Sequence, residues 1–230
     1  MSDWQSAIDP RGPQAAQLGA LVWLFASVAA AIWLAVMLVL VAALWRRRRA
    51  VAGERGPAIA VGVATAATVL VILGLTVASY VTTRRTSSDL ADALVIQLKG
   101  YQWWWAATYA ATRPAEAFTT ANELHVPVGR PVRIELEAMD VIHSFWVPNL
   151  GGKKDAVPGH TTALWIEANQ PGTYKGQCTE FCGDGHADML ITVVAHDQNE
   201  YATWAAEAVR QADLLNDPKT AAGRDAFLGG

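Results

Sequence analysis

The chain begins with two long apolar stretches, residues 18–45 and 58–83, which contain no Asp, Glu, Lys or Arg. Each exceeds the roughly 20 residues that a helix needs to cross the hydrocarbon core of a bilayer. Because a backbone in lipid must satisfy its own hydrogen bonds, both stretches predict transmembrane helices. The first is too long for the apolar region of a secretory signal peptide, and it lacks a charged start and a small-residue cleavage site.

The loop between the two stretches is rich in arginine. Residues 46–49 are four consecutive arginines, and Arg55 follows shortly after. Short basic loops remain on the cytoplasmic side of a membrane. We therefore expect a multi-pass protein of the bacterial inner (plasma) membrane, with both termini and the rest of the chain on the periplasmic side.

Beyond residue 90 the pattern changes to short segments in which apolar and polar residues alternate. In one of them Val132, Ile134 and Leu136 face one way, while charged residues between them face the other. Turn formers such as Gly and Pro separate the segments. Strands are predicted at Glu123–Val128, Pro131–Glu137, Ile142–Val147, Thr161–Glu167, Gly172–Gln177 and Met189–Ala195. Short strands at this spacing, with no long helix between them, favour an all-β sandwich or barrel.

The last part of the chain is alanine-rich and periodic from Glu200 to Leu215, which predicts a surface helix. The predicted organisation is an external N-terminal tail (1–17), a first transmembrane helix (18–45), a cytoplasmic loop (46–57), a second transmembrane helix (58–83), a linker (84–90), an all-β domain (91–198) and a C-terminal helix and tail (199–230).

Composition agrees with a membrane anchor joined to a polar domain, since 52% of residues are hydrophobic and only 17% are charged. Residues 1–83 hold six arginines and three acidic residues, a net charge of +3, whereas residues 84–230 hold 12 basic and 18 acidic residues, a net charge of −6. An acidic outer domain argues against nucleic acid as a partner and suits a basic soluble protein.

The only two cysteines lie in a dense group of potential metal ligands. Cys178 and Cys182 are four residues apart, His186 follows four residues later, and Met189 three residues after that. Thiolate, imidazole and thioether together suit copper, and two thiolates on one loop can bridge two ions. A second imidazole is then needed, and His143 at the edge of a predicted strand fits best.

Other interpretations of these residues remain open at this stage. The two cysteines could form a disulfide in an oxidising compartment, and Met189 could be a core residue. Zinc is disfavoured because a thioether is a poor zinc ligand. The tryptophan run at Trp103–Trp105 would usually be core packing. The remaining histidines, His125, His160 and His196, have no comparable neighbours in the sequence and are interpreted as surface or hydrogen-bonded residues.

The stretch from Cys178 to Met189 resembles the signature of the CuA centre, a binuclear copper site, in the cytochrome c oxidase subunit 2 family. The signature reads cysteine-x-glutamate-x-cysteine-x-x-x-histidine-x-x-methionine. The aspartate-x-x-histidine-serine motif at Asp140–Ser144 also matches, and the similarity extends to residues 102–105, 150–159 and the two-helix anchor. This resemblance implies a cupredoxin-like Greek-key domain.

The resemblance also implies a role for each matching residue. Cys178 and Cys182 would bridge both copper ions, His143 and Met189 would complete one, and His186 with the backbone carbonyl of Glu180 the other. The Glu180 side chain would bind magnesium at the interface with the catalytic subunit. Trp103 would receive the electron from cytochrome c, and Glu54 would serve proton uptake.

On this interpretation the chain is the electron-accepting subunit of a proton-translocating terminal oxidase. Its partners would be a haem-bearing subunit 1, a subunit 3, the lipid bilayer and cytochrome c or a similar donor, and it would hold no oxygen-reducing site itself. Departures from the family pattern lie near the donor face: Trp104 replaces a frequent tyrosine, and Ala106 follows the aromatic run where an acid is common.

Two alternatives compete with this function. One is a membrane-anchored copper chaperone or thiol oxidoreductase, which would usually have a thioredoxin-like fold with alternating strands and helices. The other is a metal-free quinol oxidase subunit 2 homologue, which would share the fold and the anchor but lack the copper ligands. The complete ligand set in this sequence argues against the second alternative.

Overall fold

The structure is a computed structural model that describes residues 5–45, 55–86, 93–109 and 117–216. The chain divides into two compact units. One is a pair of helices within residues 17–88, and the other is a β domain that includes the N-terminal segment up to Ala16. Each unit is described by itself below.

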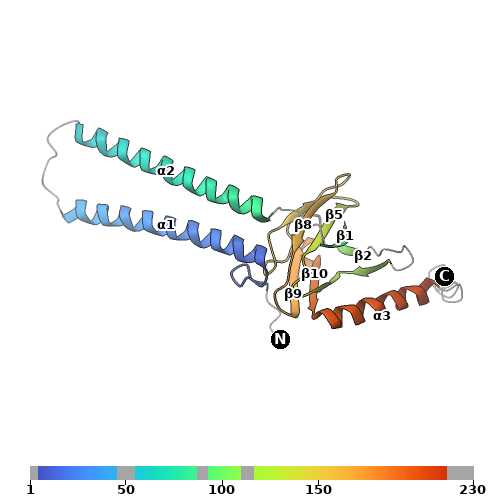
Figure 1. Cartoon of the computed structure of the whole chain (residues 1–230). Coiled ribbons are helices and arrows are strands. Elements are labelled where there is room, and N and C mark those ends of the chain that lie inside the picture. The colour runs from blue at the N-terminus through green and yellow to red at the C-terminus, as the bar shows by residue number, and fades with distance from the viewer. Residues whose placement is uncertain (1–4, 46–54, 87–92, 110–116, 217–230) are drawn as a thin grey trace. The chain divides into compact units, whose positions relative to one another are not determined.

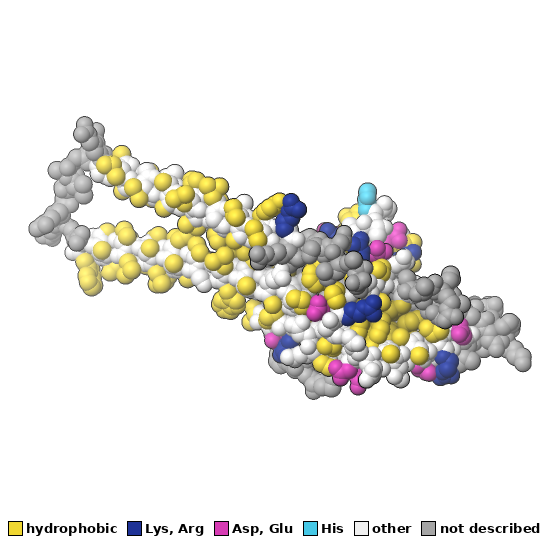
Figure 2. Space-filling view, in the orientation of Figure 1, with side chains coloured by type: hydrophobic (Ala, Val, Ile, Leu, Met, Phe, Trp, Pro, Cys, Tyr) yellow, Lys and Arg dark blue, Asp and Glu magenta, His cyan; other side chains and the backbone are white. Residues whose placement is uncertain are grey.

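The two helices of the first unit are apolar all round. Helix α1 spans Pro13–Trp45 and helix α2 spans Arg55–Thr86, and they run side by side (Figure 1). Both are long and apolar enough to cross a membrane. Hydrophobic side chains cover the helices on the face shown in Figure 2, which suits an apolar environment rather than water. Both predicted stretches lie inside the observed helices; α1 starts earlier, with Pro13 at a first helical position that proline favours.

The second unit is a sandwich of two five-stranded sheets. The first sheet joins, in spatial order, β3 (Phe118–Ala121), β2 (Trp104–Tyr109), β1 (Leu94–Tyr101), β5 (Val132–Ala138) and β8 (Thr162–Ile166). The second joins β4 (Glu123–Pro127), β10 (Leu190–His196), β9 (Gly172–Cys178), β6 (His143–Trp146) and β7 (Lys154–Ala156). The β1–β5 and β4–β10 pairs are parallel, and the other pairs are antiparallel. The expected cupredoxin-like β-sandwich is therefore present.

Alternation along the strands builds the core of the sandwich. In β5 the residues Val132, Ile134 and Leu136 are fully buried, and the charged residues between them are only partly buried. Leu98 of β1 and Val193 of β10 join them in one hydrophobic cluster. Burying a leucine or valine side chain contributes about 1.5–3 kcal/mol, so the period-two pattern fixes which face of each strand points inward.

The N-terminal segment is bound to the β domain by backbone hydrogen bonds. The Arg11 N–H donates to the Asn149 carbonyl at 2.7 Å, and the Asn169 N–H donates to the Arg11 carbonyl at 2.8 Å. The Asn149 side-chain amide donates to the Asp9 carbonyl at 2.8 Å. The predicted external tail is thus, over its described residues, part of the folded domain.

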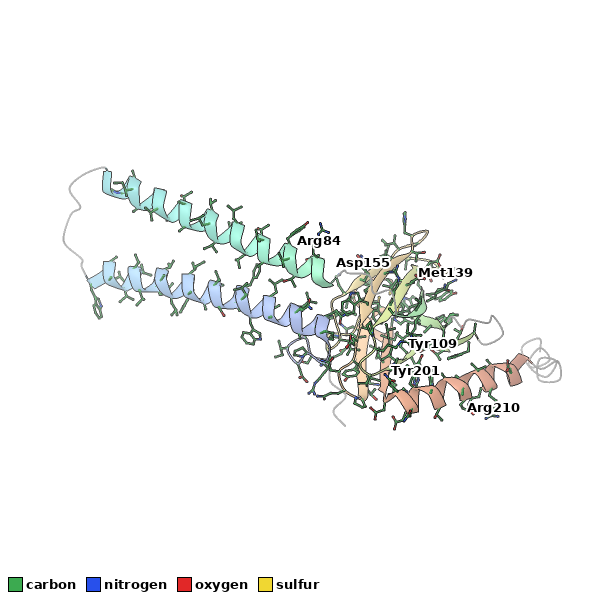
Figure 3. The ribbon with its side chains drawn as sticks, viewed as in Figure 1. Arg84, Tyr109, Met139, Asp155, Tyr201 and Arg210 are labelled. Atoms are coloured by element: carbon green, nitrogen blue, oxygen red, sulfur yellow. The ribbon has the colours of Figure 1, made fainter. Side chains whose placement is uncertain are left out.

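The C-terminal helix α3 spans Gln198–Asn216 and packs on the domain chiefly through the ring of Trp204, with a further ion pair between His196 and Glu200. The Trp204 ring stacks on His125 at a centroid distance of 4.0 Å and meets Tyr109 and Phe118 edge-on at 5.3 and 5.4 Å. Figure 3 labels Tyr109 and, on α3, Tyr201 and Arg210. The predicted surface helix is confirmed, and Trp204 is its anchor.

Candidate metal centre

The antiparallel β9–β10 pair brings the sulfur-bearing residues together. Strand β9 ends at Cys178, and β10 begins immediately after Met189. The Cys178 N–H donates to the Met189 carbonyl at 2.9 Å, which closes the intervening loop. A 3₁₀ turn, η2 (His186–Asp188), lies in this loop and carries the second predicted imidazole. The hairpin thus converts a linear ligand motif into a compact cluster.

The side chains of this cluster converge at distances suited to shared metal ligation. The ligand atoms of His143, Cys178 and Cys182 lie within 4.8 Å of one another, and all three residues are buried. The separations are 3.9 Å for Cys178 Sγ–Cys182 Sγ, 3.9 Å for Cys178 Sγ–His143 Nδ1, 3.5 Å for Cys182 Sγ–His186 Nδ1, 3.8 Å for Cys182 Sγ–Met189 Sδ and 3.2 Å for Cys178 Sγ–Glu180 O. The structure therefore brings all six predicted ligand residues together.

The two cysteines are free thiols in this structure. Their sulfur atoms are 3.9 Å apart, whereas a disulfide requires about 2.05 Å. Burial, followed by the neighbouring Cys178, raises the pKa of Cys182 to about 12. Such a thiol stays protonated at neutral pH unless a strongly bound cation replaces the proton. A buried dithiol of this kind suits a soft metal ion better than exposed thiol chemistry.

His143 is held in a single orientation by a carboxylate. It is the first residue of β6 and is fully buried, with Trp105 edge-on at a centroid distance of 5.8 Å. Its Nε2 lies 2.8 Å from Asp140 Oδ1. With Nε2 donating to the carboxylate, the Nδ1 lone pair faces Cys178 and is free to bind a metal.

Asp140 also organises the surrounding backbone. Its carboxylate accepts hydrogen bonds from the N–H groups of Gln102 and Val141, each at 2.6 Å. Desolvation opposes ionisation, but the hydrogen bonds from His143 and these two N–H groups outweigh it and lower the pKa of Asp140. The aspartate is therefore anionic at neutral pH and oriented toward the imidazole.

The aromatic run lies at the tip of the β1–β2 hairpin, where Tyr101 and Trp104 form the closing pair. Trp103 is 40% exposed, yet its Nε1–H donates to the Cys182 carbonyl at 3.1 Å. The Gln102 side-chain amide donates to the same carbonyl at 2.7 Å. Trp105, in contrast, is fully buried and belongs to the core. The run thus divides into two partly exposed rings, Trp103 and Trp104, of which Trp103 contacts the ligand loop, and one core ring, Trp105.

The other predicted functional carboxylates lie in different surroundings. The Glu180 side chain is exposed, with its Oε2 3.9 Å from Lys153 Nζ. Glu54 lies outside the described residues. Of the three unassigned histidines, His160 is exposed, and His125 and His196 hydrogen-bond to each other at 2.6 Å. The interpretation of these three as surface or hydrogen-bonded residues is confirmed.

Asp140 and Gln102 contact the site without having been predicted to do so, although both lie within the matching motifs. The signal for Asp140 was its position three residues before His143, a spacing at which a carboxylate can reach back to an imidazole. Gln102 carried no such signal, because its two contacts join segments that are far apart in the sequence.

Comparison with known proteins identifies the β domain. Residues 110–196 match the family model described as cytochrome c oxidase subunit II, periplasmic domain. The chain is 40% identical over 136 residues to cytochrome c oxidase subunit 2 of Alkalihalophilus pseudofirmus, an alignment that covers 59% of this chain and 39% of that protein. It is 36% identical over 118 residues to a probable quinol oxidase subunit 2 of Staphylococcus haemolyticus, covering 51% of this chain and 30% of that protein.

A solved structure adds a relative that is matched over almost its whole length. The periplasmic domain of subunit II of cytochrome oxidase from Bradyrhizobium japonicum is 33% identical, with 54% of this chain and 97% of that chain covered and a TM-score of 0.49. The chain spans less than half the length of the two curated relatives above. Residues 110–196 of the β domain are thus identified as a cytochrome c oxidase subunit II periplasmic domain, and the chain is similar to cytochrome c oxidase subunit 2 over more than half of its length.

Proposed function

We propose that this chain is the electron-accepting subunit of a membrane-bound haem–copper oxygen reductase, and that it holds a binuclear copper centre. The observation that carries the proposal is the convergence of two thiols, two imidazoles, a thioether and a backbone carbonyl at one end of the β domain. This donor set fits copper. The bound copper pair would supply a one-electron redox couple.

The residues around the cluster suit a centre that transfers electrons without binding a small substrate. His143, Cys178, Cys182 and Met189 are each at most 3% exposed, so water is largely excluded from the donor atoms. Strands β6 and β9 pair directly, Phe145 with Cys178, so the strand that begins at His143 is hydrogen-bonded to the strand that ends at Cys178. Rigid ligands and a dry environment keep reorganisation small when the charge of a centre changes.

Trp103 is the proposed site at which an electron arrives. Its ring is partly exposed, and its Nε1–H is hydrogen-bonded to the carbonyl of the ligand residue Cys182. The exposed apolar side chains nearby are Trp104 at the start of β2 and Val141 and Ile142 in the loop before β6. The exposed Asp140, which binds the Gln102 N–H, and Asp184, between two glycines that lie against Trp103, add negative charge beside this apolar surface. Such a surface suits a basic, soluble cytochrome c-type donor.

The remaining assignments follow the same proposal. Helices α1 and α2 would anchor the chain in the inner membrane beside the haem-bearing subunit 1 and a subunit 3, with the β domain and both termini on the periplasmic side. The exposed Glu180 carboxylate would bind magnesium at the interface with subunit 1, after separating from Lys153. Glu54 would contribute to proton uptake, a role carried by the family resemblance alone.

Mixing the copper-loaded full chain in detergent with reduced cytochrome c tests the proposal. We expect oxidation of the cytochrome by the wild-type chain and at least a tenfold slower reaction after Cys182→Ser or Trp103→Leu, which corresponds to an activation barrier raised by about 1.4 kcal/mol. An exposed-surface variant, Glu207→Ala on α3, serves as the control. Reaction rates that do not differ between wild type and Cys182→Ser would exclude the proposed electron transfer.

The quinol oxidase form remains a second candidate, because probable quinol oxidase subunits 2 are among the relatives. Copper binding and the oxidation of reduced cytochrome c by this chain distinguish the two candidate functions. A quinol oxidase subunit without metal would bind no copper stoichiometrically and would leave reduced cytochrome c unoxidised. The thioredoxin-like alternative predicted alternating strands and helices, whereas the described part of the domain is a β-sandwich with one C-terminal helix.

A further inference from the structure

The indole of Trp103 lies directly on the backbone of the ligand loop at Gly185. A Cβ atom placed on Gly185 would lie 2.5 Å from Trp103 Cδ2, 2.6 Å from Cγ and 2.8 Å from Cε3. Contacts this short essentially never occur in proteins, so no residue other than glycine fits beneath the ring as it stands. The tryptophan therefore has two contacts with the loop, the Nε1–H bond to Cys182 O and the face of the ring on Gly185.

Space, and not backbone conformation, is what requires glycine at this position. Gly185 has φ −86° and ψ 13°, which lies in a region that L-residues adopt. Gly183 beneath the same ring is different, because its φ of +115° itself favours glycine. An alanine at residue 185 would thus change only the room available to the Trp103 ring.

The contact at Gly185 adjoins the next ligand. The peptide after Gly185 leads directly to His186, whose Nδ1 is 3.5 Å from Cys182 Sγ. We infer that Gly185 is a positioning residue for electron transfer: without a side chain, it lets the exposed Trp103 ring rest on the peptide preceding His186. The ring is then joined to the loop both there and at Cys182.

This inference rests on the proposed function, in which a single electron passes from the ferrous haem of a cytochrome c-type donor, which becomes ferric, to the copper centre, which is reduced by one electron. No bond is formed or broken. Gly185 acts only through the ring of Trp103, because it contributes no side chain of its own. Its effect should therefore disappear when the ring is removed.

A second glycine provides a contrast. A Cβ on Gly100 in β1 would lie 2.8 Å from His143 Cδ2, 3.1 Å from its Cγ and 3.3 Å from Trp105 Cζ3, so Gly100 makes room for a ligand and a core ring and not for Trp103. A Cβ on the buried Gly151 would meet its nearest neighbour, Gln14 Cβ, at 3.7 Å, an ordinary contact. Alanine at residue 185 should therefore perturb the Trp103 ring, alanine at residue 100 should perturb the ligand His143, and alanine at residue 151 should perturb neither.

The test uses the full chain in detergent, loaded with copper, as wild type and with Gly185→Ala, Gly100→Ala, Gly151→Ala and Trp103→Leu. We expect Gly185→Ala to keep the visible absorption and electron paramagnetic resonance of the copper centre while electron transfer from reduced cytochrome c slows by about tenfold or more, since a misplacement of about 1 Å can cost roughly 100-fold. Gly100→Ala should alter the copper spectra, and Gly151→Ala should change neither property.

Two further measurements separate positioning from a general structural effect. In the metal-free chain, hydrogen exchange at the Trp103 indole N–H, assigned by its loss in Trp103→Leu, should be faster in Gly185→Ala because the bond to Cys182 O is disturbed. In the Trp103→Leu background, adding Gly185→Ala should cause no further loss of rate, as expected for residues that act as a unit.

The outcomes distinguish this inference from the function on which it rests. If Trp103→Leu slows electron transfer but Gly185→Ala does not, the inference is overturned and the electron-accepting role of Trp103 stands. If neither variant slows transfer, the proposed role of Trp103 is wrong. Changed copper spectra in Gly185→Ala would also overturn the inference, because the glycine would then act on the ligands.

Discussion

Removal of the Asp140 carboxylate tests how the protein prepares His143 to bind a metal. The His143 ring is fully buried, and its Nε2 lies 2.8 Å from Asp140 Oδ1. In Asp140→Ala this N–H is left buried without its partner, at a cost of about 1–3 kcal/mol. Loss of a partner behind a metal-ligating histidine typically lowers metal affinity by about 10–100-fold, and the two estimates agree because 1.4 kcal/mol corresponds to about tenfold.

The conservative variant Asp140→Asn separates the contribution of the hydrogen bond to His143 from that of the hydrogen bond to Gln102. The remaining Oδ1 of the asparagine can still accept hydrogen bonds from His143 and Val141. Its NH₂ group would replace Oδ2, which in the wild type accepts the hydrogen bond from the Gln102 N–H, so that bond would be lost. We expect a smaller loss of copper affinity for Asp140→Asn than for Asp140→Ala. The anchoring of Gln102, and with it the hairpin tip that carries Trp103, should weaken in both variants.

The assay is titration of the metal-free full chain with copper against a competing chelator, followed by visible absorption. Glu207→Ala, which removes an exposed carboxylate on α3 paired with Arg210, is the matched control. Circular dichroism of the metal-free variants verifies that the β domain is intact. Equal copper affinity in wild type and Asp140→Ala would refute the argument that this carboxylate orients the ligand.

Three further outcomes follow from the fold. Burial lowers the pKa of His125, despite the opposing effect of Glu123, so the folded domain favours the neutral imidazole. Because the unfolded chain then binds more protons, the stability of the domain to denaturant should fall as pH drops below about 6.5. The fall should be less steep in His125→Phe. Leu136→Ala creates a cavity in the core and should lower the free energy of unfolding by about 2–5 kcal/mol, measured by denaturant titration at pH 8, and an unchanged midpoint would contradict the packing described. Trp204→Ala removes the ring that stacks on His125 and meets Tyr109, so α3 should become sensitive to limited proteolysis while copper binding persists.

The sequence predicted the features that repeat along the chain. The two uncharged stretches lie within α1 and α2, and the alternation at Val132–Leu136 matches the buried face of β5. Strands β1 and β2 received no assignment, because their residues mix apolar, aromatic and small side chains without strict alternation. Strand β7 is only three residues long, too short to produce a periodic signal.

The same distinction holds for the site. A motif on one loop revealed Cys178, Cys182, His186 and Met189, because their spacing is local. His143 was found by its own motif, and the pairing of β6 with β9 brings it to the cluster. The contacts of Gln102 with Asp140 and Cys182, and of Trp103 with Gly185, join three separate segments. No pattern within any one segment could have disclosed them, since they arise only from the packing of the hairpin tip on the ligand loop.

The most direct test of the account is the metal content and paramagnetism of the copper-loaded full chain. We predict a pair of copper ions per chain and a single unpaired electron shared equally between them, both lost in Cys182→Ser and retained in Gly151→Ala. A chain that binds one copper ion with a localised signal, or that gives the same signal after Cys182→Ser, would contradict the central claim.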